Sequence, residues 1–179
     1  MEYIKLSEEP ILPSDIDVPK IMAEDFPEGK SNVYYPDIYS GGWGYEMESA
    51  VILTPGKAGT KSHLSKVISG SEISYEHAFV PMRLYEELII FRARDDGFAG
   101  IQWNPLKQSF KVVDSRAFDI LSFSVEAFHE PVWDWLREDW ESHDAYRTDP
   151  VGREQHMRVR EQVKSQFEAE FWFDITAFR

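Results

Sequence analysis

The clearest pattern of apolar and polar positions lies in the middle of the chain and has a period of two. Four runs share it: LIIFRAR (88–94), FAGIQWN (98–104), SFKVVD (109–114) and AFDILSFSVEAF (117–128). Such alternation is typical of strands, and the Asp-Gly of DDG (95–97) favours a hairpin turn. With a second turn at NPLK (104–107) and a further strand at 46–53, the sequence predicts an antiparallel meander of about four to five strands.

After residue 128 the period becomes that of a helix. Val132, Trp133, Leu136 and Trp140 fall on one helical face, behind a Glu130-Pro131 start. A second start, Thr148-Asp149-Pro150, precedes apolar residues at intervals of four, which are Val159, Val163, Phe167 and Phe171, so this helix is expected to end near Phe173. Strands followed by helices indicate an α+β fold, with two C-terminal amphipathic helices packed on the sheet.

The first 45 residues show neither period. Five prolines interrupt them, at positions 10, 13, 19, 27 and 36, while Tyr34, Tyr35, Tyr39 and Trp43 supply apolar surface. We therefore expect an irregular proline-rich segment that wraps the domain. A chain of 179 residues suits one domain. The predicted organisation is a single domain over 1–179, irregular over 1–45, mainly β over 46–128 and mainly helical over 129–173.

The charge narrows the classes of function. The net charge is −13 and the pI is about 4.8, while 42% of residues are hydrophobic and 15% aromatic, as in a globular protein. Such a charge repels phosphate backbones and anionic membranes and favours a basic protein partner. There is no cysteine, the N-terminus lacks the basic start of a signal peptide, and no apolar run approaches the length of a membrane span. A cytoplasmic protein is expected.

Motifs for known chemistries are weak. GKAGTKS (56–62) follows a predicted strand, but its glycines are three apart and Thr60 separates Gly59 from Lys61, so a basic surface turn is favoured over a phosphate loop. Arg92, Arg94 and Trp103 favour a salt-bridged sheet surface over an RNA-binding one. No G-x-S-x-G elbow is present, and no cofactor is expected.

The histidines that could serve a metal-dependent enzyme are His129, His143 and His156. No H-x-x-x-H pair occurs, and a separation of fourteen residues places His129 and His143 about 21 Å apart on one helix. A metal site would need ligands from elsewhere in the fold. Capping or surface positions are the favoured interpretation, and no metal ligand is predicted.

The segment HEPVWDWLREDWESHDAY (129–146) is the strongest functional candidate. Trp135 lies about 200° from Trp133 around the helix and falls among acids, where an aromatic anchor could bind a partner. The predicted partner-binding residues are Glu130, Asp134, Trp135, Glu138, Asp139, Glu141 and Asp144. Alternatively, the basic start of the next helix covers Trp135.

Three functional hypotheses follow from these patterns. The first is a non-catalytic acidic inhibitor of a basic protein, for example an immunity protein that neutralises a bacterial toxin acting on nucleic acid. The second is a small hydrolase or metal-dependent enzyme that uses histidines and carboxylates of the helical region. The third is a structural or assembly protein whose acidic face is simply solvated.

Overall fold

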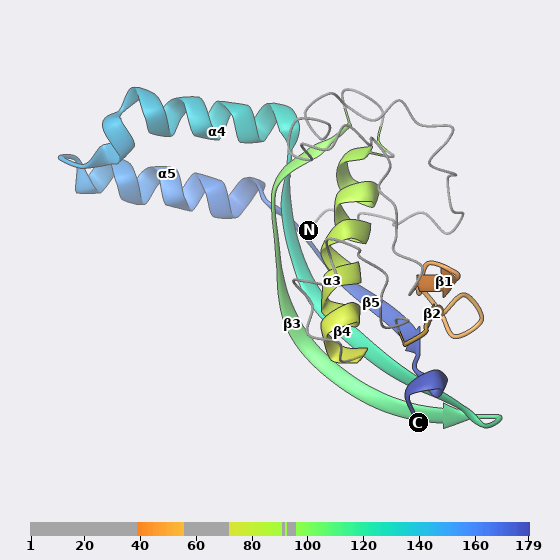
Figure 1. Cartoon of the computed structure of the whole chain (residues 1–179). Coiled ribbons are helices and arrows are strands. Elements are labelled where there is room, and N and C mark those ends of the chain that lie inside the picture. The colour runs from red at the N-terminus through yellow and green to blue at the C-terminus, as the bar shows by residue number, and fades with distance from the viewer. Residues whose placement is uncertain (1–38, 56–71, 91, 93–95) are drawn as a thin grey trace.

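A five-stranded sheet forms the centre of the computed structural model, which describes residues 39–55, 72–90, 92 and 96–179 (Figure 1). In spatial order the strands are β1 (Tyr39–Gly41), β2 (Val51–Leu53), β5 (Ser165–Asp174), β4 (Arg116–His129) and β3 (Phe98–Val113). Neighbouring strands are antiparallel except β2 and β5, which are parallel. With the helices that accompany this sheet, the predicted α+β fold is confirmed.

The core lies between one face of the sheet and the helix α3 (Glu72–Tyr85), which runs along that face (Figure 1). Alternate side chains of β4 and β5 point toward α3, and Leu121 of β4 pairs with Phe171 of β5 at the centre. Phe79 of α3 meets the Phe171 ring edge-on, with 6.2 Å between centroids. The period of two in 117–128 therefore predicted β4 correctly, because one of its faces is buried.

A helical turn that follows α3 occupies the first residues, 88–90, of the strand that was predicted at 88–94. Leu88 to Ile90 belong to a π-helical turn, Glu86–Ile90, that continues α3, while residues 91 and 93–95 lie outside the described residues. The sequence does not show an amphipathic helix here because α3 contains Pro81 and buries the charged residues Glu76 and Arg83. A buried face with charges on it breaks the apolar stripe by which a helix is normally predicted.

Arg83 is the centre of a buried ionic cluster. Its guanidinium forms ion pairs with Glu86, at 3.0 Å, and with Glu87, and its Nε donates a hydrogen bond to the hydroxyl of Tyr45 at 2.7 Å. The guanidinium also lies 4.4 Å from the ring centroid of Trp43. Burial raises the pKa of Tyr45 to about 12, so this hydroxyl keeps its proton. The cluster fixes the end of the predicted wrapping segment to α3.

The rest of that wrapping segment, 1–38, lies outside the described residues. The strand predicted at 46–53 is shorter than expected, since β2 covers Val51–Leu53 alone. The residues before it turn back, with the amide of Gly44 donating to the carbonyl of Ser49 at 2.7 Å. Gly44 has a φ of +83°, a conformation that glycine adopts without steric cost.

Strand β3 is one continuous strand where two strands and an NPLK turn were predicted. Its pairing with β4 shifts register between Pro105 and Lys107, so the sequence NPLK forms a bulge and the chain does not reverse. Proline is tolerated there because β3 is the edge strand, where an amide that faces away from the sheet needs no partner. The turn between β3 and β4 lies instead at Asp114 and Ser115, which have φ values of +48° and +66°.

Between β4 and β5 the chain forms a hairpin of two helices, α4 (Glu130–Ser142) and α5 (Pro150–Val163), which extends away from the sheet (Figure 1). Both predicted starts are confirmed, and Asp149 caps α5 by accepting a hydrogen bond from the amide of Gly152 at 2.9 Å. The predicted end near Phe173 is wrong, since α5 ends at Val163 and the next residues form β5. Among the described residues, no helix combines the length and apolarity that crossing a membrane requires.

Candidate functional site

The outer surface of α4 carries most of the predicted partner-binding residues. Exposed side chains are those of Glu130, Asp134, Trp135, Glu138 and Glu141 on the helix and Asp144 just after it. Asp134 forms an ion pair with Arg137 at 3.0 Å, and Asp144 lies 3.8 Å from Arg147. All four side chains are more than half exposed, so these arginines hold the two carboxylates only weakly. Asp139 is different, because it turns toward the inside of the helical hairpin.

Trp135 is half exposed, with 50% of its surface accessible, so the start of α5 does not cover it. The opposite side of α4 holds the helix to the rest of the molecule. Leu136 is buried there, and the ring of Trp133 packs 5.3 Å from that of Phe128 at the end of β4. Burial of the helix therefore does not account for Trp135, because its indole lies away from the face that packs.

The tip of the hairpin contains a hydrogen-bonded cluster around Asp139. The imidazole Nδ1–H of His156, on α5, donates to Oδ2 of Asp139 at 2.6 Å, and the hydroxyl of Tyr146 donates to the same oxygen at 2.8 Å. The hydrogen bond from His156, followed by that from Tyr146, holds the pKa of Asp139 below its ordinary value. The hydrogen bond with Asp139 in turn raises the pKa of Tyr146.

This arrangement resembles a carboxylate that orients a catalytic imidazole, but its burial favours a structural purpose. The side chain of His156 is 4% exposed and is surrounded by the rings of Trp140, at 5.0 Å, and Tyr146, at 5.7 Å. A general base must reach a proton on its substrate. We therefore infer that the cluster is structural. Its hydrogen bonds hold α4 and α5 together across the left-handed turn at Asp144–Tyr146.

The three histidines considered as metal ligands do not converge. His129 packs against Phe98 at the opposite end of α4, with the two rings tilted by 35° and their centroids 4.4 Å apart. His143 and His156 both approach Asp139. The Nδ1–H of His143, however, donates a hydrogen bond to the backbone carbonyl of Asp139 at 2.8 Å, and the His143 ring stacks on Tyr146. In the described ranges no three histidine, aspartate or glutamate side chains form a group that could hold a metal ion.

Other candidates from the sequence occupy different places. GKAGTKS (56–62) and Arg94 lie outside the described residues. Arg92 pairs with Asp96 at 3.6 Å in a loop, and Trp103 packs on Tyr85 of α3 at 6.0 Å, so these two residues do not share a polar sheet face. The interpretation as a common sheet surface depended on a strand at 88–94, but residues 88–90 belong to a helical turn.

Sequence reasoning missed the mutual contact of Asp139, Tyr146 and His156, and also a pocket beside Arg160 of α5. The tip cluster joins residues up to 17 positions apart across a left-handed turn. One feature of the sequence could have predicted this contact. A helix start at Asp149-Pro150 soon after the preceding helix implies a helical hairpin, in which His156 can face α4. Comparison with protein-family models, curated proteins and solved structures finds no match to this chain.

Proposed function

We propose that this chain is a non-catalytic acidic binding protein that engages a basic protein partner through the outer surface of α4. In its most concrete form it is an inhibitor, such as an immunity protein that neutralises a toxin acting on nucleic acid. Carboxylates of α4 would then occupy positions where the partner otherwise binds phosphates, and Trp135 would insert into a pocket of the partner.

The half-exposed indole of Trp135 is the observation that carries this proposal. It lies on a projecting helix between Asp134 and Glu138, both exposed (Figure 1). A tryptophan side chain has on the order of 200 Å² of surface, so covering the exposed half would bury about 100 Å². At about 25 cal/mol per Å², this contributes about 2.5 kcal/mol, or roughly a 60-fold change in affinity. A contribution of this size is typical of an interface hot spot.

The charges of α4 support a basic partner. Glu130–Ser142 contains five carboxylates and one arginine within thirteen residues. Exposed charges of one sign accelerate encounter with an oppositely charged surface, and salt weakens this attraction. A mainly apolar partner surface would leave these carboxylates desolvated without compensation, which is costly.

The test is affinity capture of partners by the tagged chain at about 50 mM and about 500 mM salt, a range over which exposed charges become screened. We expect a basic protein that is captured stoichiometrically at low salt and is lost or reduced at high salt. Trp135→Ala and Glu138→Lys should each abolish or strongly reduce capture without unfolding the chain.

Two variants serve as matched controls. Phe110→Ala removes an aromatic ring that is 51% exposed on β3, and Glu168→Lys reverses an exposed acid on β5. Neither lies on the helical hairpin, so neither should affect capture. The proposal fails if no basic partner is captured, or if the controls reduce capture as much as the two α4 variants do.

A further inference from the structure

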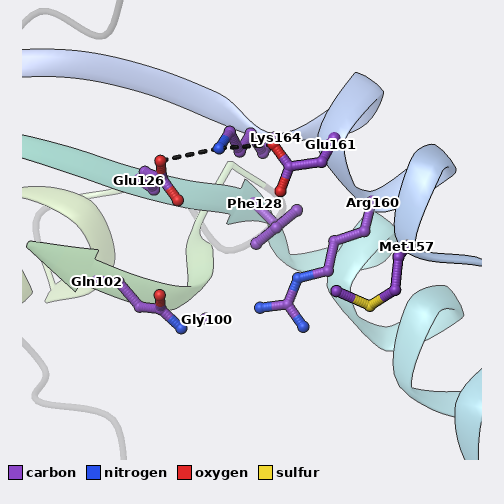
Figure 2. A pocket seen from close by; sticks show the side chains of 8 residues that line it. All are labelled: Gly100, Gln102, Glu126, Phe128, Met157, Arg160, Glu161 and Lys164. Atoms are coloured by element: carbon purple, nitrogen blue, oxygen red, sulfur yellow. Dashed lines mark hydrogen bonds and ion pairs between the residues drawn. The ribbon is translucent and has the colours of Figure 1, made fainter.

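A pocket of about 290 Å³ lies at the base of the helical hairpin (Figure 2). It is on the side of the sheet opposite α3, because its residues Glu126 and Phe128 alternate along β4 with Val125 and Ala127 of the core. Its walls come from β3, the end of β4 and the last two turns of α5. This volume is close to the lower limit of pockets that hold small molecules. The pocket does not include the outer surface of α4, so an inference about it is independent of the proposed partner binding.

Arg160 of α5 extends its guanidinium into this pocket, toward Gln102 (Figure 2). The guanidinium carbon lies 5.3 Å from the ring centroid of Phe128 and 5.4 Å from that of Trp133. Contact with two aromatic rings restricts the orientation of the guanidinium, while its N–H donors remain available at the edge. The structure gives Arg160 no ion pair with any residue in the described part of the chain.

The other cation of the pocket is already neutralised. Lys164 Nζ contacts Glu126 at 2.8 Å and Glu161 at 2.9 Å. The hydrogen bond with Glu126, and then that with Glu161, raises the pKa of Lys164, so its ammonium stays charged and bound to these two acids. The four charged side chains of the pocket sum to zero, but both carboxylates contact Lys164, so Arg160 is the cation of the pocket for which the structure gives no ion pair with a described residue.

The chemistry of the walls selects the class of ligand. A guanidinium binds a planar carboxylate through two parallel hydrogen bonds. Glu126 of β4 and Glu161 of α5 carry one negative charge more than Lys164 neutralises, so they disfavour a dianion such as phosphate more than a monoanion, because like charges repel across so small a space. Phe128 and Met157 offer apolar contact beside the arginine. We propose that this pocket binds a small monocarboxylate with a short apolar body, its carboxylate on Arg160.

Titration with phenylacetate, followed by amide and indole NMR shifts and by calorimetry, tests the proposal. We expect saturable one-to-one binding with a dissociation constant of about 1 mM or tighter, the range for a ligand of this size. The largest shifts should fall on the Gly100 amide and the Trp133 indole. Phenylacetamide, which has the same shape without the charge, should bind at least tenfold more weakly, as should inorganic phosphate.

Arg160→Gln should reduce the affinity for phenylacetate at least tenfold. Arg158→Gln is the matched control, since Arg158 carries the same charge two residues away, is exposed and pairs with Glu154. The Arg158→Gln variant should bind phenylacetate with an affinity within twofold of that of the unaltered chain. The proposal is overturned if phenylacetate shows no saturation up to about 20 mM, a range in which a specific site of this kind would fill. It is equally overturned if the amide or phosphate binds as tightly, or if both arginine variants behave alike. The ligand comparison uses the unaltered chain and stays decisive even if Arg160→Gln does not fold.

Discussion

Replacing Asp139 by alanine should destabilise the chain much more than the same replacement at Asp134, five residues earlier on the same helix. Asp139 accepts hydrogen bonds from His156, at 2.6 Å, and from Tyr146, at 2.8 Å, and its side chain is 25% exposed. Hydrogen bonds to a charged group contribute about 1.5–3 kcal/mol each when buried, and partial exposure reduces this. We expect Asp139→Ala to lower the free energy of unfolding by about 2–3 kcal/mol, because His156 also loses its partner.

Asp134→Ala removes an ion pair with Arg137 in which both side chains are more than half exposed, so its cost should stay below about 1 kcal/mol. Urea unfolding followed by tryptophan fluorescence and circular dichroism measures both values. The pH dependence adds a second check. Because the folded-state pKa of Asp139 is lowered, its contribution is complete above about pH 5, where an unfolded aspartate is already ionised, and is lost as the pH falls through the folded-state pKa. Equal losses for the two variants, or a difference that persists unchanged at pH 2–3, would refute the assignment of Asp139 as the link between the helices.

Four further substitutions test the packing, each by the free energy of urea unfolding. Gly100→Ala should cost about 2 kcal/mol or more, because Gly100 has a φ of +61° and a Cβ there would lie 2.5 Å from the Trp133 ring; no loss would show that the hairpin base is loosely packed. Phe171→Ala should cost about 3–5 kcal/mol because the Phe171 ring is fully buried, whereas Phe110→Ala should cost less than about 1 kcal/mol because Phe110 is 51% exposed. Similar costs for the two variants would contradict the described core. Ala145→Gly should stabilise the chain by up to about 1 kcal/mol, because Ala145 has a φ of +56°; a loss of stability would contradict the left-handed turn.

The fold class could be predicted because its central strands bury one face. Leu121, Phe123 and Val125 alternate with polar neighbours along β4, and the period of two records this directly. The same reasoning failed for β5. Phe167 and Phe171 are four residues apart, a spacing that fits two steps of a strand as well as one turn of a helix. The chain resolves the ambiguity by tertiary pairing, since Phe171 lies opposite Leu121.

Helix α3 and the cluster of Asp139, Tyr146 and His156 could not be predicted from the sequence for a different reason. Their key residues are polar and partly or fully buried. Arg83 is fully buried among acids that follow it by three and four positions, so α3 has no clean apolar stripe. His156 appeared to be a surface residue because its partner, Asp139, belongs to another helix. Patterns of hydrophobicity describe apolar burial, and they carry little information about polar groups that satisfy one another inside the fold.

The most direct test of the proposed function is photo-crosslinking from position 135, with p-benzoylphenylalanine placed there in the full chain and crosslinked proteins identified by mass spectrometry. The same photoreactive residue at position 110, which is equally exposed on β3, provides the comparison. We predict that one basic protein crosslinks at 135 and not at 110, and that about 500 mM salt reduces its yield. Absence of a crosslink at 135, an acidic protein there, or equal yields from the two positions would contradict the account.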